Sequence, residues 1–82
     1  RGRRDLHMTI RTRSFTTTGM HCPSCSMLIQ MVVGELDGVT SAESDHRTGM
    51  TEVVYDDAIL GPADIVGAIV RAGYGAEVAG DE

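Results

Sequence analysis

Aromatic residues are scarce in this sequence of 82 residues, which contains no tryptophan, two tyrosines and one phenylalanine. Proteins that bind single-stranded nucleic acid stack bases on aromatic side chains, so a stacking surface of that kind is excluded. Aliphatic residues and methionine must build the core, and a chain this short has room for one small domain. No apolar run approaches the roughly 18 residues of a membrane-spanning helix. We therefore expect a soluble protein with no direct membrane insertion.

Positive charge is also scarce. Seven Lys and Arg residues stand against 12 Asp and Glu residues, which gives a formal net charge of -5. Residues 1–7 hold three of the arginines and one aspartate, so the rest of the chain carries a formal net charge of -7. An acidic surface disfavours phosphate backbones and can steer a basic protein partner. Nucleic acid is therefore not an expected partner.

Residues 1–7 show no apolar periodicity, and His7-Met8 resembles a cloning junction ahead of a start methionine. We interpret residues 1–7 as an expression-tag remnant or disordered tail, and residues 8–82 as a single domain with its core at about 10–79. No apolar segment follows the first arginines as it would in a signal peptide. This favours a cytoplasmic, reducing compartment, where a close cysteine pair is more often metal-binding or redox-active than structural.

The spacing of apolar, β-branched and turn residues predicts an alternation of strands and helices. We expect strands over residues 10–18, 39–46, 51–55 and 76–78, helices over residues 24–36 and 61–72, and fraying over residues 79–82. The order strand, helix, strand, strand, helix, strand predicts an α+β fold. Its form is a ferredoxin-like βαββαβ sandwich, a four-stranded antiparallel sheet with both helices on one face.

The two cysteines, Cys22 and Cys25, stand between the first predicted strand and the first predicted helix. Their spacing allows one soft metal ion to bridge both sulfurs, and it equally allows a disulfide. A helix that starts at Pro23 places Cys25 in its first turn, where unpaired N–H groups and the helix dipole lower the pKa of a thiol. Two thiolates without a third strong protein ligand suit Cu(I), whereas a structural Zn(II) site normally has four ligands. We predict Cys22 and Cys25 as metal ligands, with Cu(I) the favoured ion and Zn(II) or another soft divalent metal the alternative.

Four blocks of this sequence together resemble the heavy-metal-associated domain family. They are Gly-Met-His-Cys-Pro-Ser-Cys at 19–25, Leu-Asp-Gly-Val at 36–39, Val-Val-Tyr-Asp at 53–56 and Ala-Ile-Val-Arg-Ala-Gly-Tyr at 68–74. The family includes bacterial copper chaperones and the N-terminal metal-binding domains of metal-pumping P-type ATPases. The resemblance implies a non-enzymatic module of metal transport and homeostasis that passes Cu(I) to or from a P-type ATPase or a cognate copper chaperone.

Three further residues, Met20, His21 and Tyr74, are candidates for a supporting role at the cysteines. We expect Met20 to anchor the turn in the core and His21 to lie in solvent, outside the metal's direct ligands. In zinc-pump domains that resemble this one an Asp often replaces this His, so His21 favours Cu(I). The matching Tyr of bacterial chaperones lies near the metal loop, which implies that Tyr74 shields or hydrogen-bonds a thiolate.

The sequence also departs from the family pattern and leaves alternatives open. Ser26, Ala42 and Ser44 stand where the family usually has larger apolar residues, so we expect weaker core packing there. One alternative is a domain that binds Zn(II), Cd(II) or Hg(II), taken from a P-type ATPase or a mercuric reductase. Another is a thiol-disulfide oxidoreductase. Two features argue against this enzyme: the chain is too short for a thioredoxin-like fold, and no aromatic residue directly precedes Cys22. We expect a monomer without metal, and two exposed sites could share copper in a metal-bridged dimer.

Overall fold

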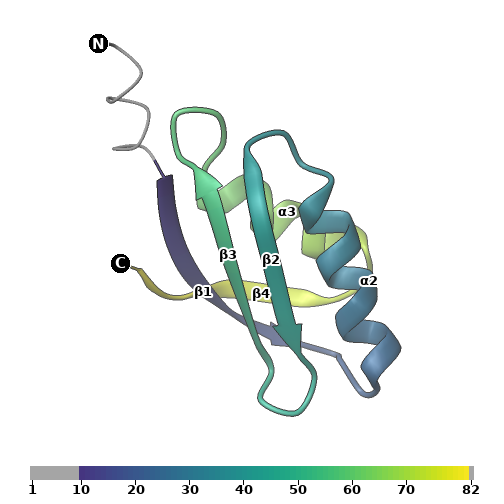
Figure 1. The fold of residues 1–82 in the computed structure, drawn as a ribbon. Helices are drawn as coiled ribbons and strands as arrows, with labels where there is room; N and C mark the ends of the chain where they lie inside the picture. The colour runs from purple at the N-terminus through teal and green to yellow at the C-terminus, as the bar shows by residue number, and fades with distance from the viewer. Residues whose placement is uncertain (1–9, 82) are drawn as a thin grey trace, which may run out of the picture.

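The computed structural model describes residues 10–81 of the chain, and these form the predicted βαββαβ order (Figure 1). The elements are β1 (Ile10–Thr18), α2 (Pro23–Gly34), β2 (Val39–Asp45), β3 (Met50–Asp56), α3 (Pro62–Arg71) and β4 (Gly75–Asp81). The proposed tag or tail at 1–7 lies outside the described residues. The division into residues 1–7 and 8–82 therefore stays a prediction.

The strands form one four-stranded sheet in the order β2-β3-β1-β4, and all neighbours are antiparallel. Phe15 of β1 lies opposite Thr51 of β3 on one side and Val78 of β4 on the other. The two helices pack on one face of the sheet, with α2 running beside the edge strand β2 (Figure 1). The ferredoxin-like α+β fold predicted from the sequence is confirmed.

The core lies between the sheet and the helices and is mostly aliphatic. Its buried members are Phe15, Met20, Ile29, Val33, Val53, Tyr55, Leu60, Ile65, Ala68 and Ile69. Strand residues two apart share a face, which buries Val53 and Tyr55 together, and helical spacing buries Ile65 with Ile69. Two of the three aromatic residues of the chain, Phe15 and Tyr55, are among the largest fully buried side chains.

The first helix ends at Gly34, two residues before the predicted end at Leu36. The N–H of Leu36 bonds to the carbonyl of Val33, and the N–H of Val39 bonds to the carbonyl of Leu36, so tight turns replace the last helical turn. Gly38 has a φ of +96° in this connection. Gly38 therefore belongs to the turn that leads into β2.

The last strand is longer than predicted, because β4 runs to Asp81 and not only over residues 76–78. The prediction of fraying is therefore wrong for residues 79–81, and residue 82 lies outside the described part of the chain. A register shift between Ser14 and Phe15 lets β1 continue its pairing with β4 as far as Arg13 opposite Asp81. A strand limited to residues 76–78 would leave backbone N–H and C=O groups of β1 without hydrogen-bond partners, and the longer β4 pairs them.

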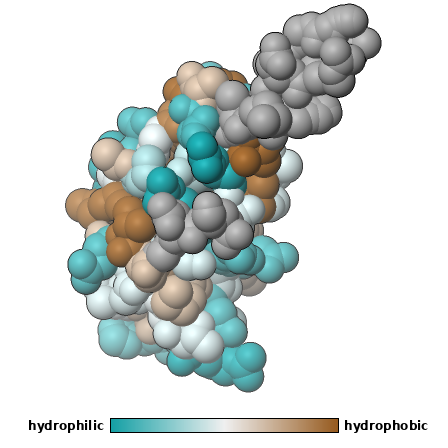
Figure 2. Space-filling model, turned by 90° about the vertical axis from the view of Figure 1, so that its left-hand side faces the viewer, coloured by the Kyte–Doolittle hydropathy of each residue, from teal (hydrophilic) through white to brown (hydrophobic). Residues whose placement is uncertain are grey.

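Apolar side chains on the surface do not form one large patch in the view of Figure 2, where brown and teal areas are interspersed. The exposed large apolar residues are Ile10, Met27, Met31, Met50, Ile59, Val70 and Val78. Scattered exposure of this kind is normal for a folded domain. Among the described residues, no helix has the length and apolar character needed to cross a bilayer.

Candidate metal centre

Both cysteines are placed by the start of α2. Cys22 is the N-cap residue, with extended φ and ψ of -155° and 165°, and Pro23 opens the helix where its missing N–H has no partner to lose. The N–H of Cys25 donates to the carbonyl of Cys22 at 3.0 Å, which closes the first turn. The chain enters this loop from β1 through Gly19, whose φ of +96° favours glycine.

This turn brings the two sulfur atoms together. Cys22 Sγ lies 3.3 Å from Cys25 Sγ, and 3.1 Å from the hydroxyl oxygen of Ser24. Both cysteines are free thiols of intermediate exposure. One soft ion can therefore contact both sulfurs while its outer side stays open to solvent or to another protein.

The pKa of Cys25 is lowered to about 7, and the largest cause is a hydrogen bond from the Tyr74 side chain. The backbone of His21 and the side chain of Cys22 lower it further, whereas desolvation acts in the opposite direction. The same bond raises the pKa of Tyr74, because the phenol keeps the proton that it donates. The sequence predicted a lowered pKa from the helix N-terminus; in the structure the side chain of Tyr74 contributes most.

Tyr74 reaches the cysteine loop from the connection between α3 and β4. Its ring lies against Gly19, where an added Cβ would stand 3.4 Å from Tyr74 Cδ1. The N–H of Tyr74 bonds to the carbonyl of Ile69, and Gly73 before it has a φ of +104°. The Gly-Tyr-Gly loop and the cysteine loop therefore meet at one end of the molecule.

Met20 and His21 take different positions, although they are neighbours in the sequence. Met20 is 8% exposed, and its sulfur accepts hydrogen bonds from Ser44 Oγ at 3.2 Å and from Ser26 Oγ at 3.8 Å. The imidazole of His21 belongs to an exposed residue, so both side chains lie as the sequence predicted. The sequence did not predict the contacts of Ser26 and Ser44 with the Met20 sulfur. The signal in the sequence was that both serines stand at positions where the family usually has apolar residues.

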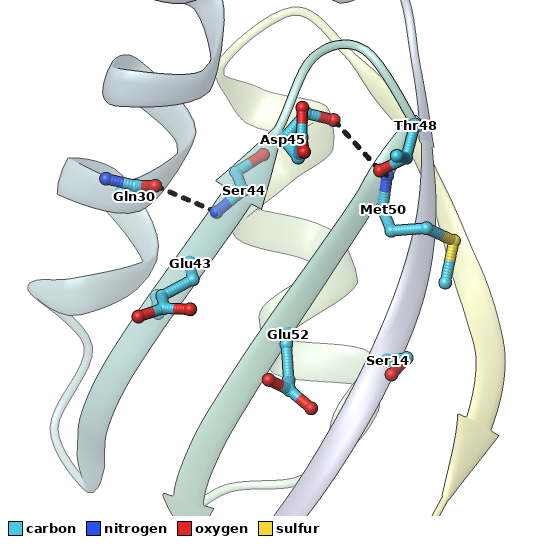
Figure 3. A pocket seen from close by; sticks show the side chains of 9 residues that line it. Ser14, Gln30, Glu43, Ser44, Asp45, Thr48, Met50 and Glu52 are labelled. Atoms are coloured by element: carbon cyan, nitrogen blue, oxygen red, sulfur yellow. Dashed lines mark hydrogen bonds between the residues drawn. The ribbon is translucent and has the colours of Figure 1, made fainter.

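Other features of residues 10–81 do not extend this centre. Within them, no group of three or more His, Cys, Asp or Glu residues is arranged to hold a metal ion. A hollow of about 770 Å³ lies over β2 and β3, and its lining contains Glu43, Asp45 and Glu52 but neither cysteine (Figure 3). The sulfur pair is therefore a surface site and not the floor of this hollow.

The profile of one family, described as the heavy-metal-associated domain, matches residues 14–75, from β1 to the first residue of β4. The chain belongs to the heavy-metal-associated domain family. This match contains all four sequence blocks that carried the resemblance. It also contains the cysteine pair and Tyr74, which the fold brings together.

Known proteins similar to this heavy-metal-associated domain include the copper chaperone CopZ of Staphylococcus aureus (strain bovine RF122 / ET3-1). The two sequences are 36% identical over 56 residues, which cover 68% of this chain and 82% of that protein. A copper binding domain from HMA7, a P-type ATPase, superposes with a TM-score of 0.86 at 29% identity, over 88% of this chain and 97% of that chain. The CopZ metallochaperone gives a TM-score of 0.78 at 29% identity, over 80% of this chain and 98% of that chain.

Proposed function

We propose that this heavy-metal-associated domain binds one Cu(I) ion through the thiolates of Cys22 and Cys25 and exchanges it with the metal-binding domain of a partner protein. The observation that carries the proposal is the 3.3 Å separation of two free sulfurs in a partly exposed turn. The domain acts as a carrier and not as an enzyme. The cysteine pair therefore serves binding, and not the turnover of a disulfide substrate.

The choice of Cu(I) follows from the donor atoms. Two thiolates are soft ligands and satisfy an ion that accepts low coordination, whereas Zn(II) normally requires four ligands and Ca²⁺ or Mg²⁺ requires oxygen. His21 stands where a carboxylate would add a ligand suited to Zn(II). The names of the CopZ relatives and of the HMA7 domain support copper. Zn(II) or another soft divalent ion is the weaker candidate.

Transfer requires that the ion be reachable while it is bound. A thiolate of the partner attacks the open side of the copper ion and forms a shared three-coordinate intermediate. One sulfur–copper bond to Cys22 or Cys25 then breaks, and its thiolate is released. A P-type ATPase or a cognate copper chaperone carries the matching cysteines, and the acidic chain favours a basic docking surface. A reducing compartment such as the cytoplasm keeps both thiols available.

We assign supporting roles to the three neighbours. Tyr74 stabilises the thiolate of Cys25 through its hydroxyl group, and Met20 anchors the loop through its buried thioether. His21, whose side chain is exposed, does not ligate the ion in this proposal. Without a partner, two copies that share one ion through four thiolates would form a metal-bridged dimer.

The proposal is tested by titrating the reduced protein with Cu(I) and with Zn(II), each against a chelator of known affinity. We expect one tight equivalent of Cu(I), with Zn(II) displaced from the protein when the two metals compete. Sedimentation of the apo and loaded samples measures whether the ion bridges two copies. Stronger retention of Zn(II) than of Cu(I) would overturn the assignment of the metal.

A further inference from the structure

A chain of hydroxyl groups runs through the protein interior and ends at the sulfur of Met20. The Thr17 and Thr51 hydroxyl oxygens lie 2.8 Å apart, and those of Thr51 and Ser44 lie 2.9 Å apart. Ser44 Oγ then lies 3.2 Å from Met20 Sδ. Thr17, Thr51 and Met20 are buried, with 3%, 0% and 8% of their surface exposed, whereas Ser44 between Thr51 and Met20 is partly exposed.

The chemistry of the last acceptor fixes the direction of the whole chain. A thioether has no proton, so Ser44 must donate its single hydroxyl proton to Met20. Thr51 must therefore donate to Ser44, and Thr17 must donate to Thr51. Each hydroxyl that donates becomes a better acceptor for the next, which makes the bonds mutually reinforcing. A group removed from this chain leaves a buried neighbour without its partner.

The hydroxyl chain joins the cysteine loop to three strands. Thr17, Thr51 and Ser44 belong to β1, β3 and β2, and the N–H of Thr17 also bonds to the carbonyl of Gly49 in the β2–β3 turn. Ser44 is fixed a second time, because its backbone N–H donates to Gln30 Oε1 of α2 at 2.8 Å (Figure 3). Met20 stands two residues before Cys22, so its position restrains where the cysteine turn begins.

We propose that the Thr17–Thr51–Ser44 hydroxyl chain positions the cysteine loop through its contact with Met20. The positioned loop holds the Cys22 and Cys25 sulfurs at the separation needed to bind one ion. The role in metal binding rests on the proposed function, whereas the positioning of the loop is a property of the protein without metal. Ser44 is a positioning residue in this account. It does not touch the metal.

A test that needs no metal is the thiol-disulfide equilibrium of the two cysteines with glutathione. One oxidised glutathione is reduced to two glutathione thiols while Cys22 and Cys25 lose two protons and two electrons and form one disulfide. A loop held in place gives the sulfurs a high effective concentration, so loosening it lowers the equilibrium constant for closure. We expect Ser44→Ala to lower this constant and the Cu(I) affinity by about tenfold each, as changes to outer partners of a metal site do.

Ser41→Ala is the matched control, because it removes an exposed hydroxyl from the same strand. If Ser44 acts through Met20, the double variant Met20→Leu with Ser44→Ala will lose no more than Met20→Leu alone. Should Ser44→Ala fold poorly, Thr51→Val removes the hydroxyl that donates to Ser44 while its shape stays nearly unchanged, and we expect this variant also to lower the equilibrium constant.

A constant for Ser44→Ala within twofold of the Ser41→Ala value, or fully additive losses in the double variant, would overturn the inference. Failure of the protein to bind Cu(I), with the change in the glutathione equilibrium still present, would instead overturn only the proposed function.

Discussion

The hydroxyl group of Tyr74 hydrogen-bonds the sulfur of Cys25, and this bond is the main cause of the lowered pKa of that thiol, about 7. The two residues lie 49 positions apart in the sequence, on the loop after α3 and in the first turn of α2. With a pKa near neutrality, Cys25 carries a much larger thiolate fraction at pH 7 than an ordinary cysteine does. In the proposed function, Cys25 therefore offers its sulfur in the form that binds a soft metal before the ion arrives.

We expect Tyr74→Phe to raise the pKa of Cys25 from about 7 toward the ordinary thiol value of 9.0, because the donated hydrogen bond is lost. The change keeps the aromatic ring against Gly19, so the fold should persist. The ultraviolet absorbance of the thiolate, followed against pH in the reduced protein, measures it. Tyr55→Phe is the matched control, since that hydroxyl contacts Arg13 and not the cysteines.

The backbone of His21 and the side chain of Cys22 should keep part of the lowering in the Phe variant. We therefore expect an intermediate pKa and not the full return to 9.0. An unchanged titration curve in Tyr74→Phe would contradict the role given to this hydroxyl.

The stability of the reduced apoprotein should rise with pH between about 7 and 9, because the folded state binds the Cys25 proton less tightly than the unfolded chain does. This contribution is complete above the unfolded pKa and is lost as the pH falls through the folded pKa. Urea unfolding under reductant at several pH values measures it. In Cys25→Ser the rise should be smaller than in the wild type, and equal slopes in both proteins would contradict the prediction.

Local sequence patterns were sufficient to predict the element order and the cysteine turn. Pro23 after an extended segment, the glycines at turns and the apolar spacing around Ile29 and Ile65 each reflect forces that act within a few residues. These features predicted the strand-to-helix junction at the cysteine loop, and the structure confirms it. The buried side chains of both helices follow the same spacing.

Interactions between distant residues could not be predicted in the same way. The length of β4 depends on the pairing of Asp81 with Arg13 across a register shift, and the pKa of Cys25 depends mainly on Tyr74. Ser44 appeared only as a residue too small and polar for its place. Its partners Thr51 and Met20 come from other elements, so the hydroxyl chain became visible only in three dimensions.

Two glycines near the end of α2 should respond in opposite directions to alanine. An added Cβ at Gly38 would lie 2.7 Å from Leu60 Cδ2 and 2.9 Å from the Ile59 side chain, at a φ of +96°. We expect Gly38→Ala to cost about 2–4 kcal/mol of unfolding free energy from the clash and the left-handed backbone.

Gly34 offers the matched comparison, because an added Cβ there meets nothing within 4 Å and the residue is helical. Gly34→Ala should stabilise the domain by about 0.4–1 kcal/mol, since alanine restricts the unfolded chain and favours the helix. Urea denaturation of both variants measures the pair. A Gly38→Ala protein as stable as the wild type would show that this turn is more adaptable than its contacts indicate.

The most direct test of the central claim is the Cu(I) affinity of the reduced wild-type protein, Cys22→Ser and Cys25→Ser, each measured in competition with a chelator. Met27→Leu is the control, because it removes an exposed sulfur from α2 and leaves the pair intact. The two-thiolate account predicts one tight equivalent in the wild type and in Met27→Leu, and loss of tight binding in each serine variant. Tight binding that survives either serine substitution would contradict it.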